Sequence, residues 1–327
     1  MSKNQTVHSH SHMWMFGILG VISGLALMIY VPSLKPVSEV LFLFAGFHLV
    51  GAIVALTSLD ALTGGKVLRR LTRRAEPGVQ RLDFGWTPGW MIGPLVAALV
   101  SLAAAVALQV ALPGWWPLAL ALTLLSALFF AGHVVAAEFL RSDLAALPMV
   151  DFLSSDRDLV LDGGCGAGRT SIAVSRMLKH GKVIALDRFD SDYIEGGGRT
   201  LLERNLAAAG VAERVEIKNG DLTRLPFPDM SFDATVSAHA IDHLGPLEQT
   251  ALAEMHRVLK PGGRFLLAVW VPGWAMFSIA SVFSLILTRP SGWRRMAARV
   301  GFEIQDEGRF NGVRYFVLRR PSLPAAA

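Results

Sequence analysis

A glycine-rich turn carries the clearest chemical signal in the sequence. The apolar run Leu159–Leu161 predicts a buried strand, Asp162 follows it, and Thr170–Leu178 predicts a helix. Between them stand Gly164, Cys165, Gly166 and Gly168. Glycine allows a backbone to turn tightly and to approach a ligand closely. The order is D-x-G-x-G-x-G, whereas the dinucleotide fingerprint G-x-G-x-x-G would need glycine where Arg169 stands.

Acidic side chains follow the next two strand-like runs. Asp187 ends the run Lys182–Leu186, about 20 residues beyond the glycines, where a carboxylate can bind both hydroxyls of a ribose. Asp221 follows the run Val215–Lys218. The alternative is that both are ordinary solvated carboxylates. Strand-like runs alternate with helix-like segments here, and this is typical of an α/β fold.

Together with two further motifs, these features resemble a known family. The matching stretches are LDGGCGAG, the strand-terminal Asp187, GDLTRLPFPDMSFD and EMHRVLKPGG, in that order, within roughly Val150–Pro321. The region resembles the class I methyltransferases that use S-adenosylmethionine (SAM), especially those of ubiquinone and menaquinone biosynthesis. The resemblance implies a Rossmann-like α/β domain with a seven-stranded, mostly parallel sheet, and SAM as methyl donor.

The resemblance also implies a role for each matched residue. The amino-acid part of SAM would lie against Asp162, Gly164, Gly166 and Gly168. Asp187 would bind the ribose, and Asp221 would bind the adenine amino group with Leu222 beside the ring. Ser237–His239 would line the methyl-transfer site. Two neighbours, Cys165 and Arg188, complete the candidate cofactor-binding set. Gly163 departs from the bulky residue usual in this turn, so we expect a looser packing contact there.

Methyl transfer from SAM requires few catalytic side chains. The acceptor atom must be held in line with the methyl group, about 3–3.5 Å away. A base is needed only when the acceptor starts out protonated. His239, Asp242 and His243 follow the strand-like run Ala234–Ser237 and are the candidates for base or substrate positioning. The alternative is that they cap or pack the following helix.

The N-terminal part of the chain has the composition of a membrane protein. The whole sequence is 52% apolar and only 17% charged, against about 25% charged in soluble domains. Apolar stretches near the roughly 18–20 residues of a membrane span cover Trp14–Val31, Val37–Leu59, Met91–Leu112 and Trp115–Leu140. We therefore predict a four-span α-helical transmembrane region at residues 1–140 and a methyltransferase domain at 141–327.

Charged loops predict the orientation of these spans. The loop between the second and third stretches contains Lys66, Arg69, Arg70, Arg73, Arg74 and Arg81. Such loops stay in the cytoplasm, so four spans place both termini and the catalytic domain there. The net charge of +5 is explained by this topology, and no nucleic-acid partner is expected.

The sequence offers little support for a metal site. Cys165 is the single cysteine, which excludes an intramolecular disulfide and a paired-cysteine zinc site. His8, His10 and His12 alternate in a polar tail that we expect to be disordered. His48 and His133 fall within apolar stretches, at different depths, so hydrogen bonds to neighbouring helices are favoured over a shared ligand.

The stretch Trp274–Thr288 is apolar and predicts a helix that lies against the membrane or covers the active site; buried core is the alternative. The sequence thus predicts a membrane-anchored methyltransferase whose acceptor is hydrophobic: a quinone precursor, an isoprenoid or a phospholipid. The alternatives are a soluble small-molecule or protein acceptor, with the helices only as anchor, and a non-catalytic SAM-binding sensor. The acceptor atom and the oligomeric state are left open.

Overall fold

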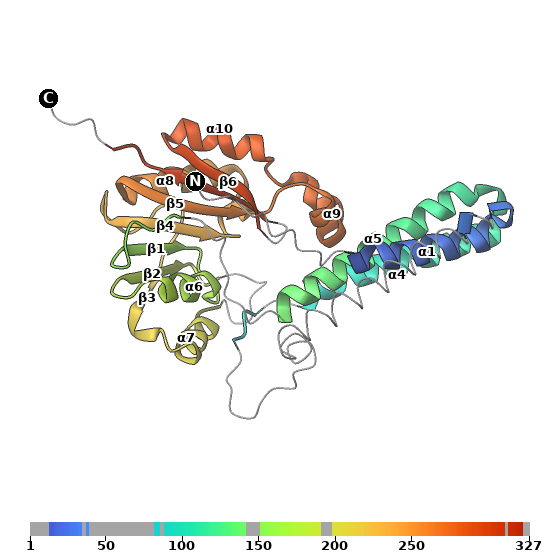
Figure 1. Ribbon diagram of the computed structural model, residues 1–327, viewed down its shortest axis with the longest axis horizontal. Coiled ribbons are helices and arrows are strands. Elements are labelled where there is room, and N and C mark those ends of the chain that lie inside the picture. Colours follow the sequence, from blue (N-terminus) through green and yellow to red (C-terminus); the bar gives the residue numbers. More distant parts are fainter. Residues whose placement is uncertain are drawn as a thin grey trace. The chain divides into compact units, whose positions relative to one another are not determined.

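The computed structural model describes residues 13–34, 37–38, 82–85, 88–141, 151–190, 198–310 and 313–322. The chain divides into two compact units (Figure 1). The first comprises residues 1–79 and 92–135, and the second comprises residues 80–91 and 136–327. The short stretch at 80–91 therefore belongs with the C-terminal part of the chain, although it lies between apolar segments in the sequence.

The first unit is built from apolar helices. They are α1 (Met13–Tyr30), the 3-10 turns η2 (Pro32–Leu34) and η3 (Pro113–Trp115), α4 (Pro88–Ala111) and α5 (Trp116–Arg141). η3 joins α4 and α5 into a hairpin, across which Ser126 Oγ donates a 2.7 Å hydrogen bond to the carbonyl of Ala98. Ala105 on α4 and Ala119 on α5 are buried, as small residues are where helices approach closely.

Two helices among the described residues are long and apolar enough to cross a membrane: Ile92–Ala111 and Pro113–Phe130. They correspond to the last two of the four predicted spans. The first predicted span falls on α1, whose described apolar part, Leu19–Tyr30, is shorter than a span. The second lies outside the described residues except for 37–38. The four-span prediction is thus not supported, because the described residues contain two candidate spans instead of four.

The second unit contains a seven-stranded sheet in the order β3-β2-β1-β4-β5-β7-β6. The strands are β1 (Leu159–Gly163), β2 (Lys182–Asp187), β3 (Val215–Asn219), β4 (Phe232–Ala238), β5 (Leu259–Val269), β6 (Glu303–Phe310) and β7 (Val313–Arg319). β1 to β5 are parallel, and β7 runs antiparallel to both of its neighbours. The predicted Rossmann-like fold with a mostly parallel sheet is confirmed. Strand order reverses between β1 and β4, the place where such sheets bind ligands.

Helices cover both faces of this sheet (Figure 1). α6 (Arg169–Met177) and α7 (Arg199–Ala208) pack on one face, with Ile172 and Leu202 fully buried. α8 (Glu248–Val258) and α10 (Pro290–Val300) pack on the other, where Leu252 and Trp293 are buried. Short 3-10 turns connect the elements: η5 (Ala212–Arg214), η6 (Ile241–His243) and η7 (Gly245–Leu247). Apolar residues line both sides of the sheet, as expected for parallel strands.

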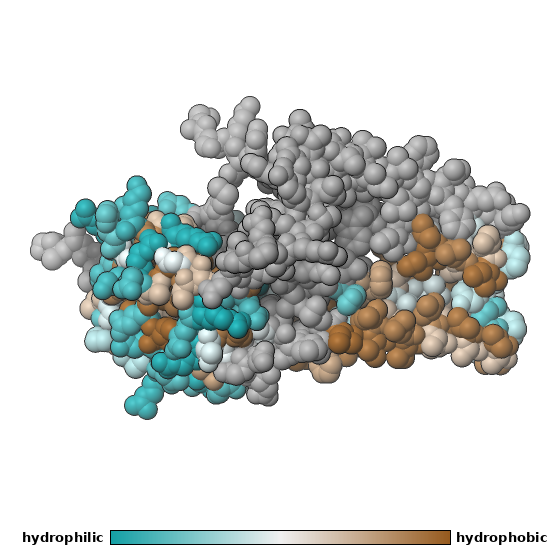
Figure 2. All heavy atoms as spheres, turned by 90° about the horizontal axis from the view of Figure 1, so that it is seen from below, coloured by the Kyte–Doolittle hydropathy of each residue, from teal (hydrophilic) through white to brown (hydrophobic). Residues whose placement is uncertain are grey.

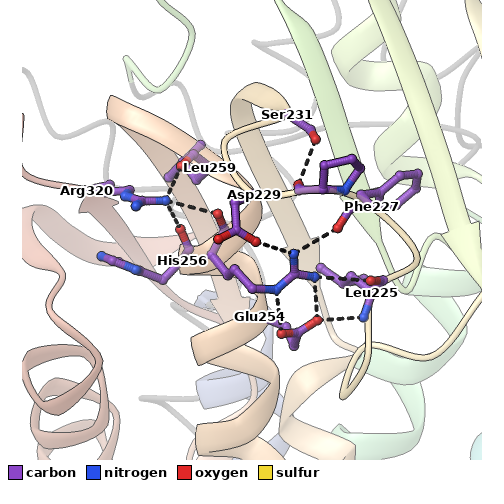
Figure 3. Close-up of polar contacts among 10 residues, drawn as sticks. Leu225, Phe227, Asp229, Ser231, Glu254, His256, Leu259 and Arg320 are labelled. Atoms are coloured by element: carbon purple, nitrogen blue, oxygen red, sulfur yellow. Dashed lines mark hydrogen bonds and ion pairs between the residues drawn. The ribbon is translucent and has the colours of Figure 1, made fainter.

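The EMHRVLKPGG motif serves the architecture of this unit (Figure 3). The Arg257 guanidinium bonds both oxygens of Glu254 at 2.8 Å and the carboxylate of Asp229 at 2.8 Å. It also donates to the carbonyls of the loop at Leu225 and Phe227. A second guanidinium, that of Arg320, donates to the carbonyls of His256, Arg257 and Leu259. These bonds fix the loop before β4 and satisfy carbonyls at the end of α8.

The stretch Trp274–Thr288 is not the single helix that its composition predicts. It forms α9 (Trp274–Ala280) and then a 3-10 segment, η8 (Ser281–Ile286). The break falls at Ser281, whose φ of +53° and ψ of −138° are incompatible with a continuing α-helix. The Ser281 carbonyl accepts a 2.8 Å hydrogen bond from Ser284 Oγ, which satisfies the interrupted backbone locally.

Candidate functional site

The glycine loop leaves the carboxyl end of β1 and is held against β2. The backbone amides of Gly164 and Cys165 both donate to the carbonyl of Leu186, at 2.8 and 3.1 Å. Gly164 and Gly168 adopt φ values of +77° and +91°, which glycine accepts without steric cost. α6 begins at the next residue, Arg169. The glycine pattern therefore makes a tight strand-to-helix turn, as predicted.

Close packing explains two of the glycines. A Cβ atom on Gly164 would lie 2.1 Å from the Cβ of Ala240, so the loop after β1 touches the loop after β4. A Cβ on Gly163 would lie 2.1 Å from Cε of Met255 and 2.8 Å from Cδ2 of Leu222. The expected looser packing at Gly163 is therefore wrong, because the long Met255 side chain from α8 fills the space that a bulkier residue would take.

Asp162 is fully buried at the end of β1. Its Oδ2 accepts a 2.6 Å hydrogen bond from Ser171 Oγ, while Oδ1 has no hydrogen-bond partner among the described residues. Burial, reinforced by the nearby charge of Asp187, raises the pKa of Asp162 to about 7. A buried acceptor without a partner is costly in a folded protein, so this oxygen is suited to bind a ligand donor.

Asp187 anchors two backbone segments. Its Oδ2 accepts the amide of Gly166 at 2.8 Å and its Oδ1 accepts the amide of Phe189 at 2.9 Å. Each carboxylate oxygen can accept a second hydrogen bond. The side chain thus organises the glycine loop and keeps acceptor capacity for the two hydroxyls of a ribose.

Arg188 and Asp221 face each other across the ends of β2 and β3. Arg188 Nη1 lies 3.6 Å from Asp221 Oδ2, and both side chains are exposed. Asp221 Oδ1 accepts bonds from the amide and the hydroxyl of Thr223, both at 2.7 Å, and these bonds lower the pKa of the Asp221 carboxyl. Leu222 beside it is buried. The structure therefore places Leu222 in the core rather than on an open surface.

The loop after β4 holds an uncharged aromatic pair. His239 has a φ of +57°, and its ring stacks 4.5 Å from that of Trp270 at the end of β5. Burial, with smaller contributions from His243 and Arg169, lowers the pKa of His239 to about 3. Its Nδ1 has no hydrogen-bond partner among the described residues, and the same holds for the hydroxyl of Ser237. Both polar atoms are thus buried groups that no hydrogen bond among the described residues satisfies.

Asp242, in the next turn of the chain, is buried. Its Oδ2 accepts the backbone amide of Trp270 at 2.7 Å, and burial raises the pKa of its carboxyl. Asp242 and His243 lie in η6, and His243 is exposed. Asp242 therefore holds the start of the segment after β5 in place, and the catalytic role of Asp242 and His243 stays a prediction.

The remaining candidate, Cys165, is buried, and burial raises the pKa of its thiol well above the usual range. A protonated thiol is a poor nucleophile, so Cys165 serves as a small apolar residue of the loop. Sequence reasoning missed Trp270 as a site residue, although it ends the strand-like run Arg264–Trp270. It also missed Phe84, whose ring lies under the Arg169 guanidinium at 4.2 Å, and no local pattern marks that residue.

The residues present fit SAM. The donors and acceptors converge at the carboxyl ends of β1, β2 and β4, where the buried Oδ1 of Asp162 has no hydrogen-bond partner in the described part of the chain. This oxygen would hold the α-ammonium group, and the spare lone pairs of Asp187 would hold the ribose. Asp162 and Asp187 lie close enough for their charges to interact. A cationic ligand would relieve that repulsion.

Comparison with known proteins agrees with this geometry. Residues 160–263 match a family described as "methyltransferase domain". A demethylmenaquinone methyltransferase from Symbiobacterium thermophilum is 34% identical over 110 residues, 33% of this chain and 41% of the relative. A sterol 24-C-methyltransferase from Eremothecium gossypii is 32% identical over 143 residues, 44% of this chain and 36% of the relative.

A ubiquinone/menaquinone biosynthesis C-methyltransferase from Rhodopseudomonas palustris is 35% identical over 135 residues, 39% of this chain and 51% of that relative. Among solved structures, a SAM-dependent methyltransferase from Methanosarcina mazei has 20% identity and a TM-score of 0.44, covering 55% of this chain and 99% of its own. The chain thus spans about half or less of these curated relatives. Its α/β unit contains a methyltransferase domain of the kind that uses SAM as methyl donor.

Proposed function

We propose that this chain is a SAM-dependent methyltransferase whose acceptor is an apolar molecule that reaches the site from a membrane. The observation that carries this proposal is an exposed apolar segment, η8, in the connection that follows the carboxyl end of β5. Phe283 is 71% exposed and Ile286 is 81% exposed, with Val282 and Leu285 exposed beside them. Contiguous exposed apolar side chains mark surfaces for ligands, partners or membranes.

On the donor side, the chain binds and orients SAM and does not itself react with it. SAM, when bound, supplies a methyl group already activated on its sulfonium. The glycine loop presents its backbone closely, Asp162 accepts from the ammonium group, and Asp187 orients the ribose. Positioning of this kind provides a large part of the rate enhancement of two-substrate reactions.

On the acceptor side, the His239–Trp270 pair is uncharged. With a pKa of about 3, His239 is neutral at physiological pH, and the raised pKa of Asp242 disfavours its anion. A neutral imidazole offers one donor and one acceptor nitrogen. His239 therefore suits the orientation of an acceptor hydroxyl or carbonyl better than the removal of a proton, since an effective base has a pKa near the working pH. Stacked on Trp270, it presents an environment matched to an apolar ring or chain.

The apolar helices provide the route to such an acceptor. Side chains along α4, such as Val96, Leu99 and Val110, are exposed in the structure, as lipid-facing residues would be. Figure 2 shows an apolar surface over the first unit and a largely hydrophilic one over the second. We take α4 and α5 as a membrane-crossing hairpin whose length suits a bilayer.

The chain connections support a location of the domain on one side of the membrane. Residues 80–91, which include the first turn of α4, belong to the same unit as residues 136–327, which include the end of α5. A hairpin that crosses and returns has both ends on one side, so the α/β unit lies on that side. The arginine-rich loop at 66–81 directly precedes this point, which favours the cytoplasmic face for the domain.

The names of the relatives point to the same class of acceptor. Demethylmenaquinone and sterols are apolar molecules of membranes, and enzymes named for them match the site-bearing part of this chain. A quinone precursor, another isoprenoid or a phospholipid remains the acceptor class that we propose.

The test is to incubate the full chain in lipid nanodiscs with methyl-labelled SAM and native lipid extract. Label in an extractable lipid product, identified by mass spectrometry, is expected. Label only in water-soluble or protein products would overturn the proposed acceptor. The absence of labelled product, with SAM binding intact, would favour the non-catalytic sensor.

Two variants test the apolar segment itself. The double variant Phe283→Ser/Ile286→Ser should raise KM for the lipid acceptor and leave SAM affinity unchanged. Full engagement of both side chains by the acceptor corresponds to roughly 3–6 kcal/mol of apolar contact. Met177→Ser is the matched control, because Met177 is an exposed apolar residue following the buried part of α6. Equal acceptor KM in the double variant and the control would remove η8 from the acceptor site.

A further inference from the structure

The segment Leu82–Gly85, which precedes α4, is packed into the methyltransferase domain. It belongs to the second unit, although it is separated from the glycine loop by about 80 residues of sequence. Phe84 is only 9% exposed and is part of the core on the α6–α7 face, together with Ile172 and Leu202. Phe84 therefore attaches the residues before α4 to the core that packs on the sheet.

A buried amide links this segment to the glycine loop. Asn205 on α7 is fully buried, and its Oδ1 accepts the backbone amide of Asp83 at 2.9 Å. Its Nδ2 donates to the carbonyl of Asp83 at 2.7 Å and to the carbonyl of Ala167 at 2.8 Å. Ala167 lies between Gly166 and Gly168 of the cofactor loop. One side chain therefore bonds the segment and the loop simultaneously.

A second link runs through Arg169, the first residue of α6. Its guanidinium stacks over the Phe84 ring at 4.2 Å, a distance at which the cation is attracted to the face of the ring. Burial lowers the pKa of Arg169 to about 10, which leaves it charged at neutral pH. The ring thus fixes a cation at the point where the glycine loop becomes a helix.

We propose that Leu82–Gly85 is a positioning element for the cofactor loop, so that SAM affinity depends on the segment that leads into the apolar hairpin. The proposal rests on the proposed function, since it assigns a determinant of SAM binding. Phe84 positions Arg169, and Asp83 completes the hydrogen bonding of Asn205. Displacing the segment would leave buried polar atoms of Asn205 without partners, which a native interior disfavours strongly. The loop carbonyl at Ala167 would then lose its fixed donor.

The test compares Phe84→Leu with Phe152→Leu in the full chain, by calorimetric titration with SAM. Phe152 is the matched control, because it is a fully buried phenylalanine of the same core cluster. Phe84→Leu should weaken SAM binding by about 3- to 30-fold, the range expected for coupling through packed contacts. Phe152→Leu should lower the melting temperature and leave SAM affinity within about twofold.

The conservative variant and the acceptor kinetics separate positioning from stability. Phe84→Tyr keeps a ring beneath Arg169 and should restore SAM affinity. The acceptor KM should stay unchanged in Phe84→Leu. Equal SAM affinity in Phe84→Leu and the wild type, or equal loss in both leucine variants, would overturn the proposal. A wild-type chain that fails to bind SAM would overturn the proposed function instead.

Hydrogen exchange on the wild-type chain keeps the test independent of folding in the variants. The amides of Asp83 and Gly85 are both hydrogen bonded, to Asn205 Oδ1 and to Asp83 Oδ1. Adding SAM should slow exchange in a peptide covering Leu82–Gly85 together with one covering the glycine loop. Protection of the glycine loop alone would show that the segment is not coupled to the cofactor, and would also overturn the proposal.

Discussion

Substitution of Asp187 is the sharpest test of the SAM site, because this carboxylate anchors the glycine loop and is the proposed ligand of the ribose. It holds the amides of Gly166 and Phe189, at 2.8 and 2.9 Å, and it retains acceptor capacity for the ribose. Asp187→Ala removes both roles. Asp187→Asn keeps one acceptor oxygen, but its amide nitrogen would meet the Gly166 donor with another donor.

The magnitude follows from these contacts. A hydrogen bond to a charged group contributes about 1.5–3 kcal/mol net, which corresponds to roughly 10- to 150-fold in affinity. Asp187→Asn loses the Gly166 anchor and one ribose contact, so we expect SAM binding to weaken by at least about tenfold. Asp187→Ala loses both backbone anchors and should also lower the free energy of unfolding by about 3–6 kcal/mol.

The assay is calorimetric titration with SAM, combined with urea unfolding. Asp190→Asn is the matched control, because it removes the same charge from the same loop. Asp190 is an exposed carboxylate near Arg188. The control should bind SAM nearly as the wild type does. A folded Asp187→Asn variant with unchanged affinity would refute the assignment, and an equal loss in the control would show that general charge, not the specific contacts, is responsible.

Three further substitutions test the glycine loop, the buried carboxyl of Asp162 and the hydrogen bonds of the Arg257 guanidinium. Gly164→Ala should lower stability by about 2–5 kcal/mol in thermal unfolding, because its Cβ would meet Ala240 and its φ is positive. The folded pKa of Asp162, about 7, exceeds its ordinary 3.8, so the folded chain holds an extra proton between these values. The free energy of unfolding should therefore fall as pH rises through that window. Asp162→Asn should make this fall smaller in urea titrations at several pH values, while the raised pKa of Asp242 still contributes to it. Arg257→Lys keeps the charge but loses the paired hydrogen bonds to the two oxygens of Glu254. It should lower the free energy of unfolding by about 1–3 kcal/mol in urea and leave SAM affinity unchanged.

Local patterns were sufficient for the main elements of the methyltransferase domain. Strand-like runs predicted β1 to β4 within about two residues of their observed ends, because apolar periodicity reports which backbone is buried. The glycine turn was predictable because a positive φ strongly favours glycine. The break at Ser281 was not, since composition alone does not distinguish one apolar helix from two short ones.

The chemical state of the site required the tertiary structure. The sequence places Asp162 and His239 beside strand ends, but their pKa values depend on how completely the surrounding chain excludes water. The same holds for Gly163, whose missing side chain is compensated by Met255 from a distant helix. Neither the pKa shifts nor the packing of Met255 can be predicted from the neighbouring sequence.

The sequence by itself determined the fold class, the glycine turn, the strand-end acids and the apolar character of the N-terminal part, because each follows from residue type and short-range spacing. Only the tertiary structure decided which residues support the cofactor loop. Asn205 bonds Asp83 across 122 residues of sequence, and Phe84 lies beneath Arg169. Such contacts depend on where the folded chain brings its segments together, and local periodicity carries no information about that placement.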